Sequence, residues 1–234
     1  MKKISEIFKS IWSIFEGNAK TFIFIVLMQI GIMILVGIIG FISGFGVIMA
    51  QLVNSPSLEN FSLTGLLAML PVILILGIVV MCVSLWTSFA LYYAAEDKKR
   101  SFSECLSLSW KSFGSGLVLS FCLGFILIIG YILFIIPGII LSVCLYFALP
   151  VLLYEKVGIL EAMKRSMALV KGYWWSILGR VLLLSLCMGL ANFILSIFGL
   201  SIVVQILMTI LLPIFTYVLY QDLLSLKGKV AKES

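Results

Sequence analysis

The stretch SFGSGLVLSFCLGFILIIGYILFIIPGIILSVCLYFALPVLLY, residues 112–154, decides the fold because it contains no Asp, Glu, Lys or Arg. A helix needs about 20 apolar residues to cross a bilayer, so this stretch is long enough for two crossings. Near its middle lies Pro137-Gly138, which is typical of a turn because proline disfavours helical backbone in the residue before it. Residues 112–154 therefore predict two transmembrane helices that form a hairpin.

Three other stretches, 21–58, 60–95 and 181–221, also lack Asp, Glu, Lys and Arg. A polar loop at 54–60 separates the first two, and the small residues of 196–201 divide the last. The predicted transmembrane helices are 21–43, 66–94, 117–136, 138–154, 175–197 and 201–221. Hydrophobic residues make up 63% of the chain and charged residues 11%, whereas soluble domains contain roughly 45–50% and about 25%. We expect an all-α polytopic membrane protein with six transmembrane helices, in which residues 1–234 form a single integral membrane domain.

The lysines and arginines outside the predicted helices predict the orientation, because they fall on one side of the membrane. They precede the first helix, follow the second and the fourth, and close the chain, whereas the three opposite loops contain none. Since cytoplasmic loops are enriched in Lys and Arg, we expect both termini in the cytoplasm. The formal net charge of +6 then favours anionic lipid headgroups of the cytoplasmic leaflet as partners, and not nucleic acid. The candidate headgroup contacts are Lys9, Lys111, Lys164, Arg165 and Lys171.

The segment before the first predicted span has the pattern of an amphipathic helix that lies in the membrane interface. Its apolar residues at helical spacing are Ile4, Ile7, Phe8, Ile11 and Phe15. The pattern Glu, five residues, Trp, two residues, Phe occurs at Glu6–Phe15 and again at Glu104–Phe113, and 159–170 is a weaker third copy. We therefore expect three interfacial amphipathic helices.

Each copy precedes two predicted spans, so the chain reads as three repeats of an interfacial amphipathic helix plus a transmembrane hairpin. The repeat units are about 1–97, 98–156 and 157–226, followed by a tail at 227–234. Internal repeats often enclose a binding site or pathway in membrane proteins. The simpler interpretation is that each amphipathic helix only positions its hairpin, with apolar residues toward lipid. Both interpretations stay open at this point.

A series of small and aromatic residues lies between residues 130 and 185. It comprises Pro137–Ser142, Tyr146–Pro150, Gly158–Ser166 and Gly172–Gly179. This series resembles the membrane domain of glycerophosphoryl diester phosphodiesterases and related uncharacterised six-span bacterial membrane proteins. The phosphodiesterase chemistry of that family lies in a separate soluble domain with histidine and acidic metal ligands, whereas this sequence has no histidine. The resemblance therefore implies the membrane part alone, transfers no catalytic residue, and implies the bacterial plasma membrane as the location.

No group of residues in the sequence indicates catalysis. The lack of histidine excludes metal and hydrolase sites built on that residue, and the five cysteines form no CxxC pair. An intramembrane enzyme acting on lipid would need a nucleophile with an adjacent base, and the sequence shows no such pair. We therefore expect that the protein is not an enzyme and that it has no catalytic residues, no cofactor and no metal site.

Polar residues inside the predicted spans are the remaining candidates for a site. The candidate polar intramembrane site consists of Gln29, Arg180, Asn192 and Gln205. Such amides most often join helices by hydrogen bonds. Arg180 has two interpretations: its side chain extends back to headgroup phosphates, or it faces the bundle interior and pairs with a headgroup or a carboxylate such as Glu155 or Asp222.

These observations favour a non-enzymatic integral membrane protein that organises or senses lipid, or escorts a membrane partner, through its interfacial helices. The alternative is a small transporter or lipid-translocating protein with its site among the four polar residues named above. The transporter requires those side chains to converge on one polar cavity. A dry, apolar centre would favour the organiser.

Overall fold

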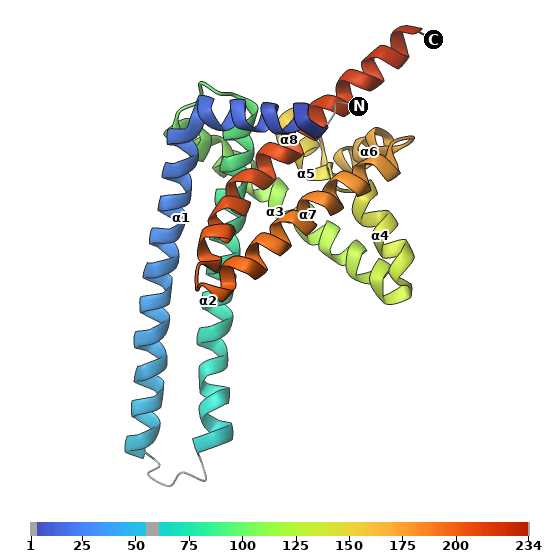
Figure 1. Ribbon diagram of the computed structural model, residues 1–234. Coiled ribbons are helices and arrows are strands. Elements are labelled where there is room, and N and C mark those ends of the chain that lie inside the picture. The colour runs from blue at the N-terminus through green and yellow to red at the C-terminus, as the bar shows by residue number, and fades with distance from the viewer. Residues whose placement is uncertain (1–3, 55–60, 234) are drawn as a thin grey trace.

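The computed structural model describes residues 4–54 and 61–233, which are helical apart from short connections and contain no β-strand (Figure 1). The helices are α1 (Ile4–Asn54), α2 (Phe61–Glu96), α3 (Phe102–Leu133), α4 (Ile135–Cys144), α5 (Ala148–Glu155), α6 (Ile159–Val170), α7 (Trp174–Ile197) and α8 (Ser201–Glu233). Six helical stretches of the described residues are long and apolar enough to cross a membrane. The prediction of an all-α, multi-pass membrane protein is therefore confirmed.

Helix α1 bends sharply at Asn18, where the backbone leaves the helical region (φ −136°, ψ 25°). Figure 1 shows the segment before this residue lying across one end of the molecule, while the rest of α1 runs along its length beside α2. The Asn18 side chain donates hydrogen bonds to the carbonyls of Ala94 (3.2 Å) and Asp97 (3.3 Å). Because Asn18 is buried, these bonds to the end of α2 hold the bend.

The other two predicted amphipathic helices are built differently. The segment Glu104–Phe113 is the first part of α3, which continues without a break to Leu133. Ser101 caps this helix by accepting a hydrogen bond from the backbone N–H of Glu104 (3.4 Å). The segment 159–170 is the separate helix α6. The expected interfacial segments are thus all helical, but the second does not bend away from its span.

The hairpin turn within residues 112–154 comes earlier than predicted. The chain reverses at Phe134, whose backbone is extended (φ −161°, ψ 148°), and Pro137 already lies in the first turn of α4. Proline is accepted there because the N–H that it lacks would have no partner within the helix. Gly138 allows the close packing that follows, since a Cβ at this position would lie 2.5 Å from the Tyr131 ring.

The predicted span 138–154 falls within the candidate crossing Ile135–Glu155, but its helix is interrupted between α4 and α5. Pro150 has no N–H for the carbonyl four residues before it, and its ring clashes with that carbonyl. Ser166 of α6 provides a hydrogen-bond partner for two backbone groups next to this break. Its hydroxyl accepts a hydrogen bond from the Phe147 N–H (3.1 Å) and donates one to the Cys144 carbonyl (2.8 Å).

The core lies at one end of the molecule, where α1 bends and both chain ends are found (Figure 1). We call this the closed end, and the opposite end the open end. Phe22, Phe89 and Leu153 are fully buried at the closed end, whereas Phe41 and Ile73 nearer the open end are exposed. The apolar surface beyond the core is therefore available to lipid, and the contacts that could build a site gather at the closed end.

Candidate functional site

Helices α2, α5 and α8 contact one another at the closed end, and each carries a carboxylate there. The chain has three arginines, and each of them pairs with one of these carboxylates. The pairs are Arg100 with Glu96 (2.8 Å), Arg165 with Glu155, and Arg180 with Asp222 (3.2 Å). The third pair is the most enclosed, with 16% of the Arg180 side chain and 4% of the Asp222 side chain exposed.

Four tyrosines, Tyr92, Tyr154, Tyr217 and Tyr220, connect the same three helices and form what we call the tyrosine junction. The Tyr154 hydroxyl donates to the Tyr92 carbonyl (3.2 Å). The Tyr217 hydroxyl donates to the Glu96 carbonyl (3.2 Å), and the Tyr220 hydroxyl to a Glu155 carboxylate oxygen (2.5 Å). The Tyr154 ring also lies 5.5 Å from Tyr217 and 5.6 Å from Tyr220 between centroids. The sequence patterns considered above did not predict this junction, although a tyrosine close to a carboxylate on each of the three helices was a signal for it.

Arg100 pairs with Glu96 next to this junction. Its guanidinium also donates to the Tyr93 carbonyl (3.2 Å) and lies 5.7 Å from the centre of the Tyr93 ring. Burial alone would lower the pKa of Arg100, but the hydrogen bond and charge of Glu96 outweigh burial and raise it overall. The arginine therefore stays charged and keeps the Glu96 carboxylate engaged.

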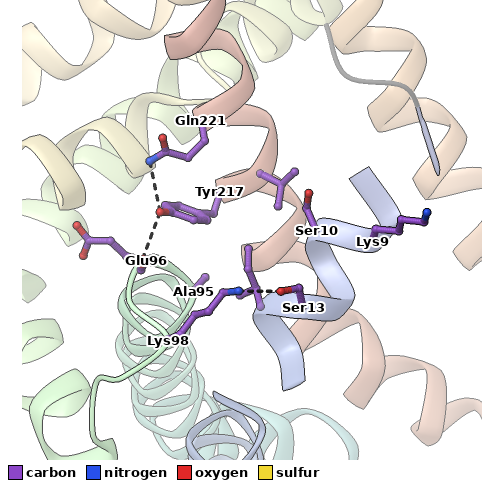
Figure 2. Close-up of a pocket in the computed structure, with 10 residues that line it drawn as sticks. Lys9, Ser10, Ser13, Ala95, Glu96, Lys98, Tyr217 and Gln221 are labelled. Carbon is purple, nitrogen blue, oxygen red and sulfur yellow. Dashed lines mark hydrogen bonds between the residues drawn. The ribbon is translucent and has the colours of Figure 1, made fainter. Parts of the chain in front are cut away.

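A cavity of about 440 Å³ lies beside the junction, between the first segment of α1, the end of α2 and α8 (Figure 2). Its polar lining residues are Lys9, Ser10, Ser13, Glu96, Lys98, Tyr217 and Gln221. Ile14, Ala95 and Val218 add apolar surface, and apolar atoms make up the larger part of the exposed lining. The cavity therefore combines ammonium, hydroxyl and amide groups and one carboxylate with apolar surface.

Hydrogen bonds fix the polar groups on the inner side of this cavity. The Lys98 ammonium donates to the Ser13 hydroxyl (2.8 Å), and the Gln221 amide donates to the Tyr217 hydroxyl (3.4 Å). Figure 2 shows the Glu96 carboxylate pointing away from Lys98 and Ser13, and the Lys9 side chain extending away from the other labelled residues. Lys98 is thus the cation inside the cavity, and Lys9 lies at its edge.

The structure places the four residues of the predicted polar site in different surroundings. Arg180 takes the interior arrangement, with Asp222 as its partner. Gln29 is partly buried on α1, and its carbonyl oxygen has no hydrogen-bond partner among the described residues. Asn192 and Gln205 are exposed on α7 and α8. The described contacts therefore place Arg180 with Asp222 and not with the three amides.

Most of the predicted headgroup contacts lie on the surface. Lys9, Lys111, Lys164 and Lys171 are exposed. Arg165 is exposed as well, but it pairs with both Glu155 and Glu161. Lys98 was not among the predicted contacts. Its neighbours Glu96 and Asp97 gave no reason to separate it from an ordinary charged loop, because its place in the cavity depends on residues of α1 and α8.

Comparisons of this chain with protein-family models, with curated proteins and with solved structures found no match. They therefore do not confirm the resemblance to the membrane domain of glycerophosphoryl diester phosphodiesterases. The structure supports the coarser statement, that six long apolar helices make this chain a polytopic membrane protein.

Proposed function

We propose that this protein is a non-enzymatic membrane protein that organises or senses anionic lipid through the segments at its closed end. The observation that carries this proposal is the distribution of polar groups. The centre of the bundle is filled by apolar and aromatic side chains such as Phe89, Phe147 and Leu219, all fully buried. The described cavity with several polar side chains lies at the edge of the molecule, where the first segment of α1 crosses it.

The first segment of α1, before Asn18, has one buried and one exposed set of apolar side chains. This arrangement allows the segment to contact the protein core and lipid at the same time. Ile7 and Ile11 are 3% and 7% exposed because they pack on the bundle, whereas Phe8 and Trp12 are 57% and 62% exposed. A helix that presents exposed aromatic residues beside a lysine such as Lys9 is suited to the boundary between headgroups and acyl chains. The segment would therefore rest on the membrane surface and bring cations to the headgroups.

The proposal includes the finer topology predicted from the sequence. The three units would each enter the membrane from the cytoplasm, with both termini on that side of a bacterial plasma membrane. The arginine-paired carboxylates Glu96, Glu155 and Asp222 support three related units, because each carboxylate lies on the second crossing of a hairpin. Within the described part of the chain, the segments that carry Lys and Arg lie at the closed end, which supports the cytoplasmic assignment through the bias of cytoplasmic loops toward cations.

The alternative function, a transporter or lipid-translocating protein, has less support. It needs Gln29, Arg180, Asn192 and Gln205 to line one cavity. Two of these residues, Asn192 and Gln205, are exposed, and Arg180 is engaged by Asp222. Hydrogen bonding between helices or to lipid explains these polar residues without a transport path.

The lipid environment of the full-length protein in nanodiscs tests the proposal. The discs would contain phosphatidylglycerol and phosphatidylcholine in equal amounts. Each lipid would carry a label in turn, so that the signal reports how much of that lipid contacts the protein. We expect phosphatidylglycerol to be enriched around the wild-type chain because the exposed lysines attract its charge. Replacing Lys9, Lys111, Lys164 and Lys171 by Gln should abolish most of the enrichment, whereas replacing them by Arg should preserve it. Wild-type protein without enrichment would contradict the proposal.

A further inference from the structure

We propose that the cavity between α1, α2 and α8 binds the phosphate group of an anionic phospholipid, with Lys98 as its cationic ligand. This inference rests on the proposed function and identifies the site at which a lipid would be recognised. The site differs from general attraction by surface lysines because it assigns the binding to one lysine, in the turn after α2, and to one hydroxyl, on α1.

The charge of Lys98 is the first observation. Its ammonium bonds to the neutral hydroxyl of Ser13 (2.8 Å). Within the described part of the chain, no carboxylate lies within ion-pair distance of it. The acid in the cavity lining, Glu96, pairs with Arg100 (2.8 Å). An ammonium has three donors, so Lys98 has donor capacity for an anion beyond its bond to Ser13.

The position of Lys98 is the second observation. Its aliphatic stem lies against Gly17, where a Cβ would be 3.0 Å from the lysine Cδ. Packing of the stem reduces the freedom of a side chain that is otherwise costly to order. The lysine is therefore directed into the cavity before a ligand arrives, and glycine at position 17 leaves room for this arrangement.

The remaining polar groups favour a ligand rich in acceptors. Ser13 accepts from Lys98 and keeps its own O–H for donation, while one N–H of the Gln221 amide is used by Tyr217 and the other is left to donate. Phosphate oxygens accept hydrogen bonds from all three groups. Since Arg100 holds the Glu96 carboxylate, the site offers little to the cation of a choline headgroup. Phosphatidylglycerol or phosphatidate fits better than phosphatidylcholine.

A lipid is favoured over free phosphate by what surrounds the cavity. Phe8 and Trp12 are exposed on the same segment that supplies Ser13, which places the opening at headgroup depth if that segment rests on the membrane. Ile14 and Val218 form an apolar wall on which the glycerol and first methylene groups can pack.

Two neighbouring lysines provide the matched test. Lys98 and Lys99 are adjacent and both exposed, but only Lys98 lines the cavity. The full-length protein in phosphatidylcholine nanodiscs would be titrated with dihexanoyl-phosphatidylglycerol, and tryptophan fluorescence would report binding. We expect Lys98→Gln to weaken binding by about tenfold or more, because it removes a charged hydrogen-bond partner. Lys99→Gln should change it by less than about twofold, since at that exposed position only screened charge is lost. Ser13→Ala should weaken binding by a few fold, which keeps the test decisive if Lys98→Gln does not fold.

Other outcomes would overturn the inference in distinct ways. Equal losses in the Lys98 and Lys99 variants would mean diffuse attraction, and would leave the proposed function intact. Equal binding of dihexanoyl-phosphatidylcholine would refute the headgroup choice. Saturable binding of inorganic phosphate at the same concentrations would show a soluble anion site instead of a lipid site. If wild-type nanodiscs show phosphatidylglycerol enrichment but this titration shows no binding, the site is wrong and the function stands.

Discussion

The beginnings of α1 and α3 carry the same sequence pattern and fold differently. Both contain a tryptophan followed three residues later by a phenylalanine, and the rings contact in each case. The centroids are 6.1 Å apart for Trp12 and Phe15 and 5.9 Å apart for Trp110 and Phe113. However, α1 bends at Asn18, whereas α3 continues straight into the membrane-spanning part.

The difference arises from the residues that follow the shared pattern. In α1, the Asn18 amide reaches across to carbonyls of α2. In α3, Ser115 donates only to the Ser112 carbonyl of its own helix (3.1 Å), and the following Gly116 packs against Phe89. An amphipathic pattern therefore determines where a helix can contact lipid, while contacts with α2 determine whether the helix bends.

The largest expected effect comes from the packing that keeps α3 beside α2. A Cβ at Gly116 would lie 2.4 Å from Phe89 Cε2, and Phe89 is fully buried and has little space to move. We expect Gly116→Ala to lower the free energy of unfolding by about 2 kcal/mol, as overpacked sites do. Titration with SDS in mixed micelles would measure it.

The matched control is Gly114→Ala, because a Cβ at Gly114 meets nothing within 4 Å. This change should be neutral or slightly stabilising, since alanine favours helix more than glycine does. If Gly116→Ala is as harmless as Gly114→Ala, then α3 is not held by close contact with Phe89, and the explanation of its straight path fails.

The sequence predicted the features that repeat along a helix but missed those made by distant residues. The six crossings and the apolar stripe of the first segment follow from local composition and periodicity. The bend at Asn18 depends on carbonyls near residue 94, and the break before Ala148 is completed by Ser166. Neither partner can be identified without the fold.

In the candidate site, too, the sequence predicted the part that depends on a local pattern and missed the part that depends on distant residues. Lys9 was predicted as a headgroup contact because it lies on an amphipathic segment, and the structure places it at the cavity edge. The rest of the cavity comes from three helices that are far apart in the sequence. The ends of α2, α5 and α8 share a tyrosine and a carboxylate, but only their contact in the fold makes them one junction.

A smaller effect is expected at the bend itself. Asn18→Leu removes both hydrogen bonds to α2 and should lower the free energy of unfolding by about 1 kcal/mol. The first segment of α1 should then be less firmly attached. Spin labels at exposed positions 8 and 99 would report this as a broader distance distribution in electron–electron double resonance.

The control in α3 is Ser115→Ala, one residue before the position that aligns with Asn18, and it removes a hydrogen bond within one helix. We expect no broadening between labels at positions 107 and 99 in this variant. If Asn18→Leu leaves the distribution of the first pair as narrow as in the wild type, the Asn18 bonds do not hold the bend, and the buried isoleucines of the segment are sufficient.

The smallest effect separates the two tryptophans of the shared pattern. Trp110 contacts both Phe113 and Trp86 of α2, the latter edge-on with centroids 5.9 Å apart. Trp12 instead contacts Phe15 and donates to Glu16 on its own helix (2.6 Å). We expect Trp110→Leu to lower the free energy of unfolding by about 0.5 kcal/mol more than Trp12→Leu, because an edge-on aromatic pair between helices is lost.

A double-mutant cycle isolates this contact. Trp86→Leu should be non-additive with Trp110→Leu and additive with Trp12→Leu, because contacting residues couple and distant ones do not. Additivity in both cycles would mean that the Trp86 and Trp110 rings interact with lipid more strongly than with each other. In that case contacts with α2 would not hold the first turns of α3. The packing that keeps α3 beside α2 would begin only at Gly116.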